Sequence, residues 1–172
     1  MAHLPNQRRF IPVALVTGVV VTLLAAGAAS TAAPRGGSVS ASPPPPPVAE
    51  LLSRGTTANK FEAESGGIEL EADRAIDVAV VHLTFEPGSS TGWHTHSGPV
   101  VVTVTAGTLA FRVGSQCTRH VYKVGDTFVE NGGRVLSRAR NPGETTTETI
   151  TTFYLPVGAA TFTPANAPAC AR

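Results

Sequence analysis

The chain has 172 residues and a mass of 17.7 kDa, which allows one ordinary domain. Its formal net charge is +1 and its 13 Lys and Arg residues are scattered, so no basic footprint indicates nucleic-acid binding. Two cysteines are too few for a disulfide-built scaffold or a structural zinc finger, and the 17 Gly, 14 Pro and clustered Val and Thr favour an all-β domain.

The first 33 residues have the order of charge and hydropathy that is typical of a secretory signal peptide. Arg8 and Arg9 lie in a polar start, residues 10–29 carry no charge, and small residues follow up to Ala33. We therefore predict export, with a secreted protein after cleavage of residues 1–33. The uncharged run is also long enough to cross a bilayer as a helix of about 20 residues, so an uncleaved segment 10–29 would instead anchor the protein to the membrane.

Residues 34–48 form a Pro-rich segment that ends in five consecutive prolines, Pro43–Pro47. Such a run adopts an extended polyproline II conformation and acts as a semi-rigid spacer. We expect a disordered linker here, followed by a folded domain at residues 49–172 in which Ala49–Arg54 could form one helical turn.

The rest of the chain is divided by Gly, Pro and Asn turns into short apolar or alternating segments, which is the pattern of β-strands. No segment after Arg54 has a convincing helical period. About eight short strands at this spacing indicate a sandwich or a small barrel. The expected strands are Ile68–Ala72, Ile76–Phe85, Val100–Thr105, Thr108–Val113, His120–Lys123, Thr127–Glu130, Val135–Arg140 and Thr145–Leu155.

Two groups of residues in this region resemble the conserved motifs of the cupins. The first comprises Pro87-Gly88, Gly92-Trp93-His94-Thr95-His96, Gly98-Pro99 and Gly107, and the second comprises Gly125-Asp126, Asn131-Gly132-Gly133 and Asn141-Pro142-Gly143. The resemblance spans about Arg54 to Cys170 and is strongest to the small, exported, single-domain bacterial cupins. It implies a jelly-roll β-barrel, also called a double-stranded β-helix, with a site in its open interior.

His94 and His96 are the candidate metal ligands. Residues i and i+2 of a strand project to the same side, so both imidazoles would enter one space, and imidazole binds most divalent transition metals. The resemblance implies a glutamate and a third histidine as further ligands, but these positions fall on Val100 and Ser137, which we expect to line the cavity. Because neither residue is a good ligand, we predict a degenerate two-histidine site that binds a divalent transition metal weakly or not at all.

Four other residues each allow two interpretations. Trp93 either lines the mouth of the cavity or packs at one end of the barrel. His82 and His120 could supply a ligand, but the alternation around His82 turns it outward and His120 fits a surface or hydrogen-bonded histidine better. Glu130 could reach the rim of the cavity, although its position beside a glycine turn favours a solvated carboxylate.

Cys117 and Cys170 are the only cysteines, and both lie in the part of the chain that we expect to be exported. An oxidising exterior allows such a pair to persist as a disulfide, which would hold the C-terminal tail. Separate thiols and pairing with another chain are the alternatives. We predict the internal bridge, because unpaired exposed thiols are unfavourable outside the cell.

These observations favour an exported cupin-domain protein that binds a small molecule without turnover. The alternative is a metal-dependent enzyme, of the oxygenase or isomerase type, that acts on a small extracellular substrate. The sequence names neither a substrate nor a catalytic residue. The resemblance also implies a homodimer formed through sheet edges, and a membrane contact is expected only if the N-terminal segment is not cleaved.

Overall fold

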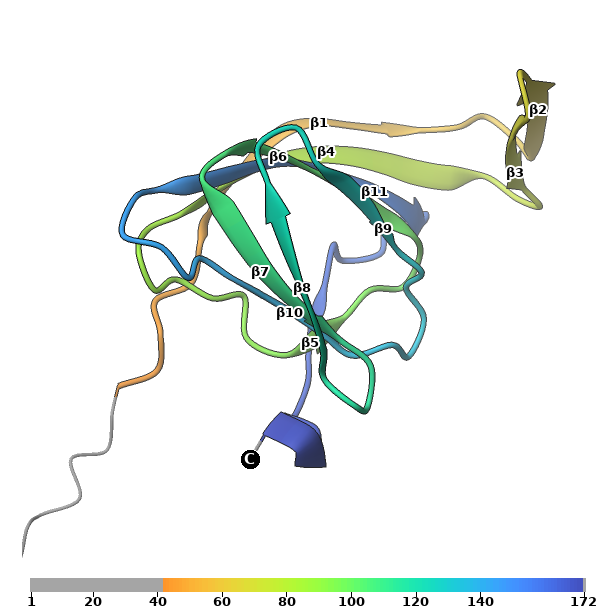
Figure 1. Cartoon of the computed structure of the whole chain (residues 1–172). Coiled ribbons are helices and arrows are strands. Elements are labelled where there is room, and N and C mark those ends of the chain that lie inside the picture. Colours follow the sequence, from red (N-terminus) through yellow and green to blue (C-terminus); the bar gives the residue numbers. More distant parts are fainter. Residues whose placement is uncertain (1–41, 172) are drawn as a thin grey trace, which may run out of the picture. The chain divides into compact units, whose positions relative to one another are not determined.

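The structure is a computed structural model that describes residues 42–171, so the predicted signal segment and the alternative anchor lie outside the described residues (Figure 1). Twelve strands and one short 3₁₀ turn occur in this part of the chain. Within residues 42–171 no helix is long and apolar enough to cross a membrane. The elements are β1 (Val48–Thr56), β2 (Phe61–Ser65), β3 (Ile68–Ala72), β4 (Ile76–Phe85), β5 (His94–Thr95), β6 (Val100–Ala106), β7 (Thr108–Val113), β8 (Thr118–Lys123), β9 (Thr127–Glu130), β10 (Ser137–Arg140), β11 (Thr147–Pro156), β12 (Thr163–Pro164) and η1 (Ala169–Ala171).

Two five-stranded antiparallel sheets form the barrel, one in the order β1-β4-β11-β6-β9 and the other in the order β12-β5-β10-β7-β8. Alternate side chains of each strand enter the space between the sheets, as a pleated strand requires. In β11 this alternation is complete, since every second residue from Thr147 to Leu155 is buried. The predicted all-β jelly roll is therefore confirmed. Its core comprises Ala79, Val81, Phe85, Val100, Val102, Val104, Leu109, Phe111, Phe128, Ala139, Phe153 and Leu155.

The expected helical turn at Ala49–Arg54 is wrong, because these residues belong to β1, which pairs with β4 along its length. A β-bulge between Leu51 and Ser53 shifts the register, so the two adjacent leucines do not alternate in the way that would mark a strand in the sequence. The strand expected at Val135–Arg140 begins only at Ser137. Strands β5 and β12 have two residues each and are too short to leave a pattern.

The last prolines of the predicted linker contact the barrel. The backbone N–H of Ser90 donates to the carbonyl of Pro45, and Pro46 and Pro47 line the main cavity together with Ala49. The contacts of the folded domain thus include residues 45–47, which precede β1.

The predicted disulfide is confirmed: Cys117 and Cys170 are bonded, with their Cα atoms 5.9 Å apart. The bridge joins the loop between β7 and β8 to the end of the C-terminal tail. The same tail pairs with β5 through β12, and the N–H of Ala165 donates to the carbonyl of Trp93. The tail is therefore fixed at several points next to the two histidines.

Candidate metal centre

His94 and His96 enter the barrel from β5, and both are almost fully buried, with exposed fractions of 4% and 5%. Each ring is oriented by a backbone carbonyl. The Nδ1 of His94 lies 3.0 Å from the carbonyl oxygen of Gly92, and the Nδ1 of His96 lies 2.7 Å from that of Thr161 in the tail. Because a carbonyl can only accept, both Nδ1 atoms carry the proton and both Nε2 atoms present a lone pair to the cavity.

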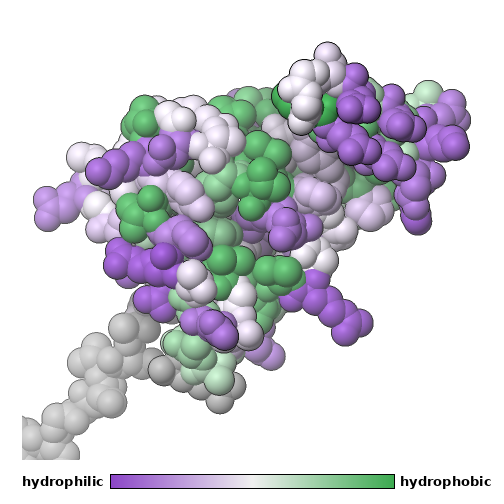
Figure 2. Space-filling view, turned by 45° about the vertical axis from the view of Figure 1, so that its right-hand side comes forward, coloured by the Kyte–Doolittle hydropathy of each residue, from purple (hydrophilic) through white to green (hydrophobic). Residues whose placement is uncertain are grey.

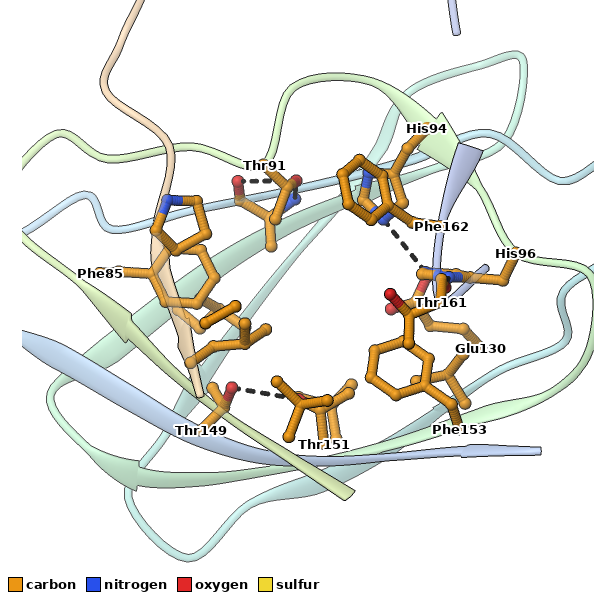
Figure 3. Close-up of a pocket in the computed structure, with 18 of the residues that line it drawn as sticks. Phe85, Thr91, His94, His96, Glu130, Thr149, Thr151, Phe153, Thr161 and Phe162 are labelled. Carbon is orange, nitrogen blue, oxygen red and sulfur yellow. Dashed lines mark hydrogen bonds and ion pairs between the residues drawn. The ribbon is translucent and has the colours of Figure 1, made fainter. Parts of the chain in front are cut away.

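The two Nε2 atoms face each other at 3.1 Å (Figure 3). Two lone pairs at this distance repel, so the arrangement requires a positive centre, either an added proton or a metal ion. An ion bound by imidazole lies about 2.0–2.1 Å from each nitrogen, which suits two donors at this separation.

Glu130 supplies a third donor atom. Its Oε2 lies 3.5 Å from the Nε2 of His96, its side chain is only 10% exposed, and the donor atoms of the three residues all lie within 4.8 Å of one another. The interpretation of Glu130 as a solvated turn carboxylate is therefore wrong, and so is a donor set limited to two histidines.

The position of Glu130 follows from the sheet register. In the β6–β9 pair Glu130 lies directly opposite Val100, the residue at the position where the resemblance implies a glutamate. Directly opposite side chains project from the same face of a sheet. The carboxylate thus enters the same space from the neighbouring strand.

A close contact between two loops brings Glu130 to His96. Gly132 has a φ of +72°, and a Cβ on it would overlap the carbonyl of Gly98. A Cβ on Gly98 would in turn overlap the carbonyl of Tyr154 on β11. Only glycine permits this approach of the loop after β9 to the loop after β5.

Ser137 lies beside His94 on the adjacent strand β10, with its Oγ 3.3 Å from the Nε2 of His94. Val100 lines the cavity, whereas Trp93 is buried outside it, with the guanidinium of Arg138 5.4 Å from its ring centre. His82 lies away from the centre and pairs with Glu148 at 3.0 Å.

His120 is exposed and stacks near Tyr122. It lines a neighbouring cavity that His96 and Glu130 also border, but it is not one of the three clustered donors.

The protonation of the two histidines differs. Burial lowers the pKa of His94 below its ordinary value, and the charge of His96 adds to this effect. Burial also acts to lower the pKa of His96, but the hydrogen bond and negative charge of Glu130, together with the Thr161 carbonyl, raise it above its ordinary value. Without a metal, the shared proton therefore belongs to His96 and the Nε2 of His94 accepts it.

The three donors stand at one end of an apolar cavity of about 160 Å³ (Figure 3). Phe85, Thr149 and Thr151 lie toward the opposite end, and Phe162 of the tail stacks edge-on against His94. The hydroxyls of the two threonines are 3.2 Å apart and can bond each other. The lining contains no Lys or Arg.

The donor set fits a divalent transition metal. Two imidazoles and one carboxylate are typical ligands of zinc, iron and similar ions. Both rings are held by a hydrogen bond from the nitrogen that does not face the cavity, which is the usual way in which a protein orients a metal-binding histidine. His94, His96 and Glu130 are thus the residues that would hold such an ion.

Comparison with known proteins agrees with this fold. The family model of the cupin domain matches residues 81–153. An uncharacterized Klebsiella pneumoniae protein with a double-stranded β-helix domain has a TM-score of 0.51 and 19% identity, over 71% of this chain and 86% of its own. A cupin domain from Bordetella pertussis has a TM-score of 0.47 and 19% identity, over 66% and 98% of the two chains.

An oxalate oxidase solved with glycolate has a TM-score of 0.41 and 23% identity, over 45% of this chain and 42% of its own. At these identities the likeness concerns the fold alone. A comparison with curated proteins finds no match. The fold and the matched family model together define a cupin domain in this chain.

Proposed function

We propose that this protein binds a divalent transition metal through His94, His96 and Glu130 and holds a small, neutral, mainly apolar molecule in the cavity beside it. The observation that carries the proposal is the orientation of the two imidazoles. Both Nδ1 atoms are committed to backbone carbonyls, so both Nε2 lone pairs meet at 3.1 Å with a carboxylate close by. This arrangement repels itself unless a cation joins it.

The cavity supports the proposed ligand class. A cavity of about 150 Å³ lined by apolar side chains accommodates benzene, and the volume here is about 160 Å³. No Lys or Arg in the lining would neutralise an anion, so a dicarboxylate would have only the metal as a counter-charge. A ring-sized molecule with one oxygen directed at the metal matches both the volume and the lining.

A metal-dependent enzyme of the oxygenase or isomerase type is the second candidate. It is favoured by the donor set, because two histidines and one carboxylate leave coordination positions open, and by an apolar cavity adjoining those positions. A bound metal would supply Lewis acidity or redox chemistry there. The chain's own residues would orient the substrate and exclude bulk water, and the Nδ1 protons of His94 and His96 would stay on the carbonyls of Gly92 and Thr161.

We also propose that the protein is exported. Support comes from the N-terminal sequence pattern and from the disulfide between Cys117 and Cys170, which suits an oxidising compartment. Sequencing of the mature N-terminus tests this, and a new N-terminus near residue 34 is expected.

Calorimetric titration of untagged, metal-free protein with Zn²⁺ and Mn²⁺ tests the metal proposal. One ion per chain is expected, with at least a tenfold loss of affinity in Glu130→Gln and in His96→Gln, since removing one ligand typically costs more than one hydrogen bond. His82→Gln is the matched control, because it removes an imidazole that is paired with Glu148 away from the centre. The proposal would be refuted if His82→Gln lost as much metal affinity as the two donor variants, or if the parent protein bound no metal.

Binding of a neutral aromatic probe tests the proposed ligand class separately from metal binding. Phenol is expected to bind metal-loaded protein more tightly than oxalate does, and Val102→Trp, which fills the cavity away from the donors, is expected to abolish phenol binding while leaving metal binding intact. Tighter binding of oxalate would contradict the ligand class.

A further inference from the structure

The hairpin β2–β3 has one acidic face. Its register places Glu62 opposite Glu71 and Glu64 opposite Glu69, so four carboxylates project from one side. The two strands contain no Lys or Arg. Directly opposite like charges destabilise a strand pair, and a lone two-stranded hairpin is marginal in water. Both strands pack mainly against each other, and the hairpin extends beyond the barrel at the far end of β1 and β4 (Figure 1).

The outer face of the second sheet has the opposite character. Arg138, Arg112 and Arg119 are cross-strand partners in one row across β10, β7 and β8, on the side away from the buried Phe111. Arg140 and Lys123 extend the same face. The five strands of this sheet contain no Asp or Glu. Within residues 42–171, none of these five cations forms an ion pair.

These two faces are complementary in charge. Each is the surface of a β-ladder, in which neighbouring strands lie about 4.8 Å apart, so the arginine row across three strands and the paired glutamates of the hairpin are spaced alike between strands. Each face repels itself in the isolated chain, and contact between them relieves both repulsions. The charges that look scattered in the sequence are thus separated into an acidic arm and a basic sheet.

We propose that the protein forms a two-fold symmetric dimer in which the hairpin of each copy lays its glutamate face on the arginine face of its partner. Each copy carries both surfaces, so the dimer contains two identical hairpin-to-sheet contacts and leaves neither surface free to bind a third copy. Figure 2 shows hydrophilic and hydrophobic side chains side by side at the upper right, where the hairpin lies. Only one hairpin face can dock, and the charge match selects the acidic one. The interface is independent of the cavity and of metal.

Sedimentation velocity with charge-reversed variants tests the dimer. The parent protein is expected to be dimeric at 50 mM NaCl and to dissociate at 1 M NaCl, because the Debye length falls to about 3 Å. Glu62→Lys/Glu71→Lys and Arg112→Glu/Arg138→Glu should each be monomeric. An equimolar mixture of the two variants should dimerise again, because each reversed face then meets its complement; this result also shows that both variants are folded.

The control Glu86→Lys/Glu144→Lys makes the same charge change at exposed loop residues that belong to neither face and should remain dimeric. A parent protein that is monomeric at 50 mM NaCl would overturn the proposal, and so would a mixture that stays monomeric. A dimer that survives charge reversal but is lost in Ile68→Ser/Leu70→Ser would assign the interface to the apolar face of the hairpin and would equally overturn it.

Discussion

Removing the disulfide is expected to have a large and calculable effect on stability. The bridge joins residues 53 positions apart, and closing a loop of this length in the unfolded chain corresponds to about 4 kcal/mol in the chain-entropy model. The free energy of unfolding of a domain is typically about 5–15 kcal/mol, so Cys117→Ser/Cys170→Ser should lose a major part of it.

Equilibrium urea unfolding of the oxidised parent and the double variant measures this loss. The midpoint should fall, and either single variant should lose about as much as the double variant, because one missing sulfur already opens the loop. A loss below about 1 kcal/mol would contradict this expectation, since it would mean that residual structure already restricts the unfolded chain without the bridge.

Three further changes test other parts of the structure. Asp77 accepts hydrogen bonds from Thr56, Gly158 and Arg54, which lower its pKa to about 2. The stabilisation from the ionised carboxylate is therefore complete above about pH 5 and is lost as the pH falls toward 2. Asp77→Asn should remove this pH dependence of the melting temperature. Gly98→Ala should displace the backbone that contacts Tyr154 and weaken both stability and metal binding, as measured by thermal unfolding and titration. In metal-free protein, Glu130→Gln should lower the pKa of His96 in an NMR titration, because the main group that raises it is removed; an unchanged pKa would show that the carboxylate is not its partner.

Local patterns were sufficient for the fold and for two of the three metal donors. The strand alternation from Ile76 to Phe85 and the turn glycines define the sheets, and the i, i+2 spacing of His94 and His96 directs both rings into one space. The bulge in β1 interrupts this alternation, which is why a strand there resembled a helical turn.

The third donor depends on information that a sequence does not carry locally. Val100 and Glu130 are 30 positions apart, and only the β6–β9 register reveals that a carboxylate lies opposite the valine. The approach of Gly132 to Gly98 likewise joins two loops that no short motif relates. The same holds for the arginine row, whose members come from three strands.

The most direct test of the three-donor metal centre is an anomalous diffraction measurement on crystals of the untagged protein soaked with Zn²⁺ or Mn²⁺. One strong peak per chain is expected inside the barrel, about 2.0–2.2 Å from the Nε2 atoms of His94 and His96 and from a carboxylate oxygen of Glu130. A peak on the two histidines with Glu130 turned away, or no peak in the barrel at saturating metal, would contradict the three-donor centre.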